Sequence, residues 1–272
     1  MTAVSLGISP VNELIQRQGM RASGRLAVGS SVEQLRYREL LQRSHRLSAR
    51  LIALGGRSGA PVGVCLPRGP RSVAATLAVL ESGASALPIH PDASPGRVGS
   101  ILAAADATTC LTDRAEGGPT SRPEEQVDPP LLLSRQGSWV SQILEAQMVC
   151  PLTPGDTMLH ASSVESSDAG IEMFWPLCVG ANVVAHEAKD PMSRWLACQR
   201  SRATVMVVSV GVLDELLDFQ DANSLFPPPQ LRQVVCTGEP LSHALASRFA
   251  EQIGRHGCSL HSVTGVAQDC AL

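Results

Sequence analysis

Hydrophobic and polar positions along the chain follow two repeats, one helical and one typical of short buried strands. One amphipathic helix is predicted to run from Tyr37 to the Gly55-Gly56 pair, because leucines recur close to every 3.6 residues, at Leu40, Leu41, Leu47, Leu51 and Leu54. The run from Pro61 to Pro67 is apolar and bounded by prolines, which predicts a buried strand. The same patterns predict helices at 71–81, 97–105, 139–148, 211–219 and 241–253, and strands at 86–89, 108–111, 131–133, 181–185, 205–210, 231–236 and 259–263.

Strands and helices that alternate in units of about 25–30 residues are typical of a parallel α/β sheet with helical crossovers. We expect an N-terminal segment at 1–24, a first α/β lobe at 25–113 and a second α/β lobe at 131–272. Between the lobes, residues 114–130 are rich in proline, glycine and glutamate and lack apolar periodicity, so we expect a linker or surface loop there. A chain of 272 residues is long enough to bury a sizeable core.

Composition excludes several classes of protein. With 44% apolar and 17% charged residues the chain is not disordered, and its net charge of -3 leaves no electrostatic footprint for nucleic acid. Only one of its 22 basic residues is a lysine, Lys189, which excludes any chemistry that needs a second lysine. One tyrosine and four phenylalanines give no platform for base stacking.

Cysteine spacing and the N-terminus point to a reducing compartment. No two of the eight cysteines are closer than twelve residues, so no zinc-type spacing occurs and buried free thiols are expected. The N-terminus lacks the basic and apolar regions of a secretion signal, and the longest apolar run is too short to span a bilayer. We therefore expect a cytoplasmic protein with no membrane partner.

Common catalytic motifs are missing from the sequence. It contains no GxSxG, GxGxxG, GxxxxGK[ST] or HExxH, and its seven histidines are scattered without metal-ligand spacing. From these motifs alone the chain is an α/β protein with no visible active site.

Five segments carry recognisable sequences in a fixed order: LRYREL at 35–40, VLESGASALPI at 79–89, LTPGD at 152–156, EMF at 172–174 followed by PLCVGA, and LRQVVCTGE at 231–239. Together they resemble the N-terminal part of adenylate-forming (AMP-binding) enzymes, and most of all the adenylation domains of nonribosomal peptide synthetases, over about residues 25–272. The resemblance implies the large N-terminal part of that fold. It also implies a family chemistry in which a carboxylate and ATP give an acyl adenylate and pyrophosphate.

The phosphate-binding loop of the family is not found. The family has a loop rich in glycine, serine and threonine just before a strand that LLLSR at 131–135 resembles. Here EEQVDPP stands at 124–130, and carboxylates next to a triphosphate repel it. We therefore expect residues 114–130 to replace the loop and to bind no phosphate.

The nucleotide and substrate residues of the family are altered too. In the stretch that resembles its N-L-Y-G-P-T-E motif, Gly265 is kept, Thr264 replaces the adenine-stacking aromatic, and Gln268 replaces the carboxylate that helps to hold Mg²⁺. Ser167 falls where the family has the aspartate that grips the substrate amino group. Asp168 comes one residue later, about 100° further round a helix.

These correspondences define the expected site. Gly238, Glu239, Thr264 and Gly265 form a vestigial nucleotide side, and Ser167 and Asp168 a vestigial substrate side, with no metal site and no catalytic residue. We expect the site to bind ATP or AMP weakly, and we do not expect it to hold Mg²⁺. The family's C-terminal mobile lobe with its catalytic lysine should follow Leu272 and is absent from this sequence, while Lys189 in the loop HEAKDP is expected to be solvated.

The leading hypothesis is a truncated, degenerate adenylation-like domain that does not catalyse adenylation. It would act as a scaffold or interaction module, with synthetase partner domains, a carrier protein or a small helper protein as partners. One alternative is an ATP-dependent ligase completed by a separate C-terminal lobe or by another protein chain. A further alternative is a small-molecule-binding module without catalysis.

Overall fold

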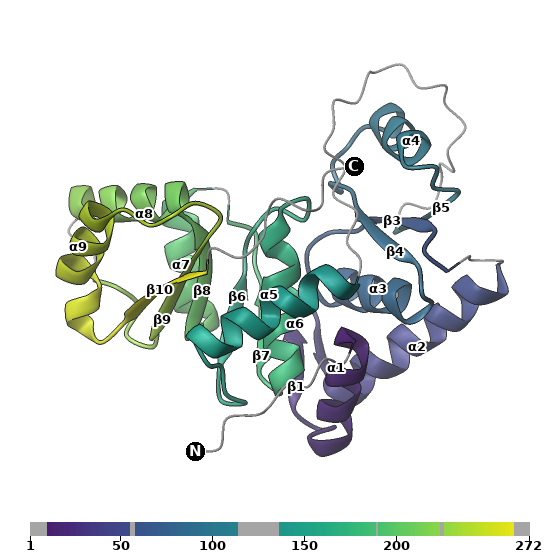
Figure 1. Cartoon of the computed structure of the whole chain (residues 1–272), viewed down its shortest axis with the longest axis horizontal. Helices are drawn as coiled ribbons and strands as arrows, with labels where there is room; N and C mark the ends of the chain where they lie inside the picture. Colours follow the sequence, from purple (N-terminus) through teal and green to yellow (C-terminus); the bar gives the residue numbers. More distant parts are fainter. Residues whose placement is uncertain (1–9, 55–57, 114–135, 189, 224–225, 264–272) are drawn as a thin grey trace.

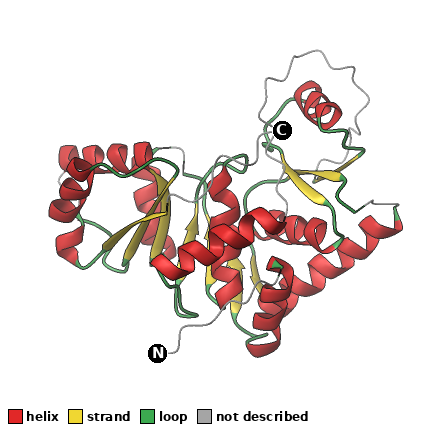
Figure 2. Ribbon diagram, in the orientation of Figure 1, coloured by secondary structure: helices red, strands yellow, loops and turns green. Residues whose placement is uncertain are grey.

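The computed structural model describes residues 10–54, 58–113, 136–188, 190–223 and 226–263 of the 272-residue chain. Figures 1 and 2 show helices packed on and between two β-sheets. The helices are α1 Val11–Arg21, α2 Tyr37–Ala53, α3 Pro70–Glu81, α4 Pro95–Ala104, α5 Gln136–Val149, α6 Ser167–Val179, α7 Pro191–Ser201, α8 Val210–Asn223 and α9 His243–Gln252. The strands are β1 Leu26–Gly29, β2 Gln34–Arg36, β3 Pro61–Cys65, β4 Ser85–Pro88, β5 Thr109–Thr112, β6 Thr157–His160, β7 Asn182–Ala185, β8 Val205–Ser209, β9 Gln233–Thr237 and β10 Ser259–Val263.

The two sheets are almost entirely parallel. The larger has the order β10-β9-β8-β6-β7-β1-β2, and only β2 runs antiparallel to its neighbour; the smaller has the order β4-β3-β5 and is parallel throughout. Parallel neighbours require crossover connections, which the intervening helices supply. The α/β fold expected from the sequence is confirmed.

The molecule has five layers, in which helices and sheets alternate. A cluster of buried side chains lies between each pair of neighbouring layers. One cluster joins α7, α8 and α9 to one face of the seven-stranded sheet, and the largest joins the other face to α1, α5 and α6. Side chains of α2 and α3 belong both to that largest cluster and to one against the three-stranded sheet. The last cluster packs α4 on the far face of the small sheet. Figure 1 accordingly shows α8 and α9 at one end of the molecule and α4 at the other.

Tyr37, within the first of the five motifs, joins the start of α2 to the end of α6 in the middle layer. Its side chain is fully buried, and its hydroxyl donates to the carbonyl oxygens of Leu177, at 3.2 Å, and Ala181, at 2.6 Å. These carbonyls belong to the end of α6 and the turn that follows it. The turn forms because Gly180 adopts φ +85°, a left-handed conformation that glycine takes without a steric cost. The first and fourth motifs therefore meet as a structural joint.

Several short elements differ from the prediction. Strands β1 and β2 and helices α1 and α7 were not expected, and β2 has only three residues, too few for a period of two to emerge. Strand β1 pairs with β7 and with β2, so both β1 and β2 belong to the large sheet, although residues 25–113 were assigned to the first lobe. The division into lobes at these boundaries stays a prediction. The proposed linker at 114–130 and the strand at 131–133 lie outside the described residues.

Seven of the eight cysteines fall within the described residues, and all seven are free thiols. Six of them are buried, and burial raises their pKa where a shift is resolved, for example to about 12 at Cys236. Neutral buried thiols fit a packing role, as expected. Among the described residues no helix is both long and apolar enough to cross a membrane.

Candidate functional site

The order of the strands indicates where a ligand-binding crevice can form in this fold. The chain runs from β6 to β7 on one side and then returns across β6 to β8 on the other, so the connections diverge at the carboxyl ends of β6 and β8. In open α/β sheets, ligands bind outside the carboxyl ends of the strands at such a switch point. The first turn of α6 and the end of β9 lie at this edge.

Asp168 joins these two segments. The carboxyl group of Asp168 lies close to the side chain of Thr237, the last residue of β9, whose hydroxyl donates to the Val208 carbonyl at 3.4 Å. Ser166 caps the helix, its hydroxyl accepting from the Asp168 backbone N–H at 3.2 Å. Burial raises the pKa of Asp168 above its ordinary value, and the nearby Thr237 side chain offsets only part of that effect.

Glu172, one turn further along α6, holds the loop after β6. Its side chain is fully buried and accepts four hydrogen bonds: from His160 Nδ1 at 2.7 Å, the backbone N–H groups of Ala161 and Ser162 at 3.0 Å, and the Ser162 hydroxyl at 2.7 Å. Four donors directed at one carboxyl group hold the loop after β6 against α6. His160 is therefore a bonded core residue, although its Nε2 has no hydrogen-bond partner among the described residues.

Two arginines bring positive charge to the same edge. Arg68, in the connection after β3, donates from Nη2 to the Ser162 carbonyl at 2.5 Å and from Nη1 to the His186 carbonyl at 3.3 Å. Burial lowers the pKa of Arg68, and the charge of Glu172 opposes that effect. Arg194 of α7 is only 9% exposed and also adds its charge near Arg68. Arg68 thus ties the small sheet to the edge of the large one.

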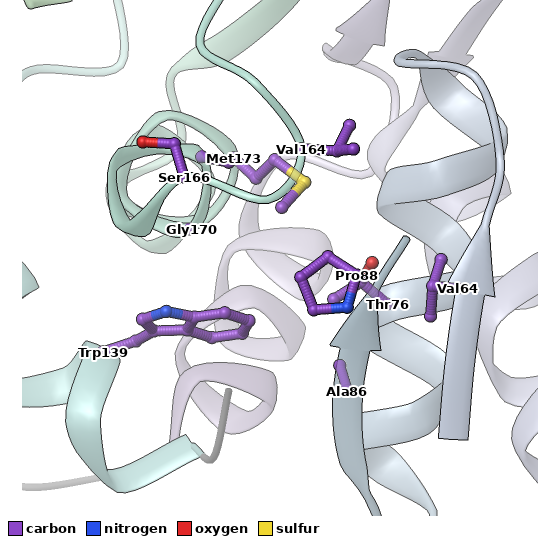
Figure 3. Close-up of a pocket in the computed structure, with 10 residues that line it drawn as sticks. Val64, Thr76, Ala86, Pro88, Trp139, Val164, Ser166, Gly170 and Met173 are labelled. Carbon is purple, nitrogen blue, oxygen red and sulfur yellow. The ribbon is translucent and has the colours of Figure 1, made fainter. Parts of the chain in front are cut away.

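A small apolar pocket lies on the other side of the first turns of α6 (Figure 3). Val64 and Pro88 of the small sheet face Met173 and Gly170 of α6 across it, and Trp139 of α5 lies beneath them. Its volume is about 20 Å³, which has room for about one water molecule. This pocket is a gap in the joint between the layers and too small for an acyl or adenine group.

The predicted site residues are brought together only in part. Asp168 meets Thr237, directly before the Gly238–Glu239 turn, and Ser167 is half-buried beside Asp168. Gly238 has φ +85° and is exposed, with no atom near the position of a Cβ.

Three predicted residues, Thr264, Gly265 and Gln268, lie outside the described residues, so their roles stay predictions. Within the described ranges no three histidine, cysteine, aspartate or glutamate side chains converge as a metal site.

Sequence reasoning missed the polar network around Glu172. Arg68 and Arg194 carried no motif, and His160 was read as one of several scattered histidines. The only local signal for Arg68 was its position directly after an apolar run bounded by prolines. Glu172 was noted only as part of a motif, with no partner assigned.

Two sheets around a shared helical layer, with a topological switch point at the carboxyl ends of β6 and β8, define a doubly wound α/β protein. The profile of the AMP-binding enzyme family matches residues 15–142 and 132–267, and the chain belongs to that family. Within it, the likeness is to nonribosomal peptide synthetase adenylation domains, as the motifs indicated.

Curated relatives are large synthetases. The chain is 26% identical to tyrocidine synthase 3 of Brevibacillus parabrevis over 89% of its own length and 4% of that protein. It is 27% identical to phosphinothricin tripeptide synthetase PhsB of Streptomyces viridochromogenes, over 85% of the chain and 23% of the relative. The chain therefore spans less than a quarter of the length of these relatives.

Solved structures share the fold. A nonribosomal peptide synthetase, FmoA3 bound to AMPPNP, superposes with a TM-score of 0.78 at 23% identity, over 96% of this chain and 32% of that one. The N-terminal subdomain of Klebsiella oxytoca NpsA in complex with 3-hydroxyanthranilyl-AMSN has a TM-score of 0.78 at 18% identity and covers 100% of this chain and 77% of that one.

Proposed function

We propose that this chain is an adenylation-like module that does not form acyl adenylates by itself. It acts as a scaffold or interaction module in a cytoplasmic biosynthetic assembly. The observation that carries the proposal is the attachment of Arg68 to two main-chain carbonyls at the crevice edge.

Adenylate formation places developing negative charge on the α-phosphoryl group and on the departing pyrophosphate, and catalysis depends on cations and donors aimed at that charge. The described crevice offers Arg68 and Arg194. Nη1 and Nη2 of Arg68 are bonded to the carbonyls of His186 and Ser162, and Arg194 is almost fully buried; Arg68 Nε and Arg194 Nη1 have no hydrogen-bond partner among the described residues. Lys189 is the only lysine of the sequence, and it lies outside the described residues. The two Arg68 donors that are already bonded to main-chain carbonyls are not available to the leaving group.

Small-molecule binding without catalysis is the second candidate, and the Asp168–Thr237 contact favours it. This contact keeps the first turn of α6 next to the turn after β9, which are the two sides of a ligand crevice. The NpsA neighbour is described as an N-terminal subdomain in complex with a small molecule. An N-terminal part of this fold therefore suffices for ligand binding in that protein, which supports the same capacity here.

The partners we propose are synthetase domains, a carrier protein or a small helper protein. The curated relatives are multidomain synthetases, and one structural neighbour is an artificially fused adenylation–PCP di-domain with a TM-score of 0.76. An adenylation-like module of this kind would meet such domains in its assembly.

The deciding experiment is amino-acid-dependent exchange of pyrophosphate into ATP, with the purified chain alone and with a complete adenylation domain as positive control. We expect no exchange above the no-enzyme rate with the common amino acids and several aryl acids. Exchange by the chain alone would refute the proposal. Exchange that arises only on adding a separate C-terminal lobe would establish the ligase alternative.

Calorimetry separates binding from catalysis. We expect weak ATP or AMP binding that is nearly independent of Mg²⁺. The crevice variant Asp168→Ala should weaken the binding of an acyl-sulfamoyl nucleoside analogue, while Asp92→Ala, an exposed residue of the small lobe, should not. Equal affinities for both variants would place the ligand elsewhere.

A further inference from the structure

A large groove lies on the face of the seven-stranded sheet that α7, α8 and α9 leave open. It has a volume of about 720 Å³. It begins at the amino ends of β6 and β7, near Thr157 and Asn182, and runs along β7 to Ala185. Val184 and Gly29, which are register partners in β7 and β1, form part of its floor.

An open face at this point is unusual for a parallel sheet. Sheets of parallel strands are normally covered on both faces, and the opposite face of β7 and β1 packs into the largest core cluster. On the groove side, α7 packs against β6 and α8 and covers neither β7 nor β1 among the described contacts. Val184 is only half-buried as a result.

The rim of the groove is positively charged. Arg200 and Arg202, at the end of α7, are exposed and line it, and neither guanidinium has an ion-pair or hydrogen-bond partner among the described residues. None of the described residues that line the groove is acidic. Two amide side chains in the lining are already bonded within the protein: Asn182 donates to Thr157 Oγ1 at 3.1 Å, and Gln230 donates to the carbonyls of Cys198 and Gln199 at 3.2 Å.

We propose that this groove is a docking site for an extended acidic segment of a partner protein. An extended segment presents alternate side chains to opposite sides, so apolar residues can lie on the Val184–Gly29 floor while the carboxylates between them reach Arg200 and Arg202. Two unpaired arginines without a competing carboxylate favour a negatively charged partner and disfavour a basic one. The groove is separate from the Asp168 crevice, so its test does not depend on the outcome of pyrophosphate exchange.

Two independent sets of substitutions test the proposed docking site. Arg200→Ser with Arg202→Gly removes both charges, and the glycine suits position 202 because Arg202 has φ +53°, a conformation in which glycine is unstrained. Gly29→Val fills the floor without a change of charge. A Cβ at Gly29 meets only Gln34 and Leu26 atoms at 3.8 and 3.9 Å, in ordinary contact, and valine suits a strand. Arg97→Ser on α4, an exposed arginine of the other sheet's layer, is the matched control.

The probe is a fluorescein-labelled decapeptide of alternating glutamate and valine, with a lysine–valine decapeptide as counter-probe. Binding is measured by fluorescence anisotropy with the full chain, and circular dichroism checks that each variant folds. We expect the glutamate peptide to bind and the lysine peptide not to bind. The charge-removal and Gly29→Val variants should each weaken binding about fivefold or more, roughly 1 kcal/mol, while Arg97→Ser stays within about twofold.

Four results would overturn the proposal. The first is glutamate-peptide binding that folded groove variants leave unchanged, and the second is equal binding of the lysine peptide. The third is concentration-dependent self-association of the chain, seen by sedimentation, that Gly29→Val abolishes together with peptide binding. That result would assign the groove to a second copy of the chain. Absence of any binding of the glutamate peptide to the unaltered chain would also refute it.

Discussion

Asp156 and Arg232 form a bidentate ion pair that joins the amino ends of three strands. Arg232 Nε lies 2.6 Å from Asp156 Oδ1, and Nη2 lies 2.5 Å from Oδ2. Thr204 Oγ1 donates to Oδ1 at 2.8 Å, and the Thr153 backbone N–H donates to Oδ2 at 2.7 Å. Asp156 ends the LTPGD motif and Arg232 stands in LRQVV, so two motifs that identify the family hold each other in place.

Asp156→Asn should destabilise the fold. The Asp156 side chain is 3% exposed and its carboxylate is fully paired, while Arg232 is 40% exposed. Breaking a buried pair costs about 3–5 kcal/mol, and the exposure of Arg232 reduces this to about 2–3 kcal/mol. Urea unfolding followed by circular dichroism measures the change.

Asp214→Asn is the matched control, because Asp214 is 53% exposed and pairs with Arg248 on the surface. It should change the free energy of unfolding by less than about 0.5 kcal/mol. A similar loss for the two variants would mean that the Asp156 pair has no special structural role.

The contribution of the Asp156–Arg232 pair to the free energy of unfolding should depend on pH. Burial alone raises the pKa of Asp156, but hydrogen bonds from Arg232, Thr153 and Thr204 outweigh burial and hold that pKa below its ordinary value. Because the folded-state pKa lies below the unfolded value of about 3.9, the pair stabilises fully above that pH and loses its effect as the pH falls through the folded pKa. The difference in unfolding free energy between the unaltered chain and Asp156→Asn should therefore be constant down to about pH 5 and shrink below about pH 4. A difference that grows on acidification would contradict this assignment.

Tyr37 should not ionise in the folded chain. It is the only tyrosine of the sequence, so the near-ultraviolet tyrosinate absorbance reports on it alone. Burial raises its pKa far above the ordinary value, with the nearby Cys178 thiol adding to the effect. We expect no tyrosinate signal at about pH 11 until the chain unfolds, whereas an exposed tyrosine is mostly ionised there.

Tyr37→Phe should cost about 1–2 kcal/mol in the free energy of unfolding, because two buried carbonyls lose their donor. The carbonyls are those of Leu177 and Ala181. An early tyrosinate signal in the folded chain, or a neutral Tyr37→Phe, would show that the hydroxyl is not held as described.

Sequence periodicity predicted the elements whose burial has a regular pattern. Helix α2 buries Tyr37, Leu40, Ser44, Ser48 and Leu51 on one side, close to the leucine repeat that predicted it. Helix α6 has no comparable repeat, because nearly all of its residues from Ala169 to Val179 are buried and no polar face remains. The sequence therefore did not predict α6, and we only considered how far apart Ser167 and Asp168 would point on a helix.

The polar part of the site was hidden for a different reason. Arg68 and Glu172 lie more than a hundred residues apart and share only the loop that contains Ser162. Their association depends on how two sheets pack, which no local pattern records. Asp168 was found because it lies next to a motif position, and its contact with Thr237 joins two segments that the resemblance had already singled out.

Asp168→Asn should stabilise the chain at neutral pH. Burial raises the pKa of Asp168, so the unfolded chain holds the ionised form more favourably than the folded one does. Asparagine removes the charge at nearly the same side-chain size, and the expected gain is up to about 1 kcal/mol at pH 7. This gain should vanish below the unfolded pKa of about 3.9, where the native carboxyl is also protonated. A loss of stability at pH 7 would mean that the charge of Asp168 is itself stabilising, through Arg194.

Gly170→Ala tests the joint between α5 and α6. A Cβ at position 170 would lie 2.3 Å from Trp139 Nε1 and 2.5 Å from Cε2, far inside contact distance. Trp139 is 5% exposed and packs on Phe174 with ring centroids 4.9 Å apart, so its ring has little room to move. Alanine favours a helix interior by about 1 kcal/mol over glycine, whereas overpacking costs about 1–3 kcal/mol. We expect a net loss of about 1 kcal/mol and a lower Tm.

The cause of that loss can be isolated with two further variants. Gly96→Ala in α4 adds the same methyl group to a helix where nothing lies within 4 Å of the new Cβ, so it should be neutral or slightly stabilising. Trp139→Leu removes the clashing ring atoms, so adding Gly170→Ala to that variant should no longer lower its stability. A double-mutant cycle in urea gives the coupling energy directly. Additive effects of the two substitutions would show that Gly170 is not required for the approach of Trp139 to α6.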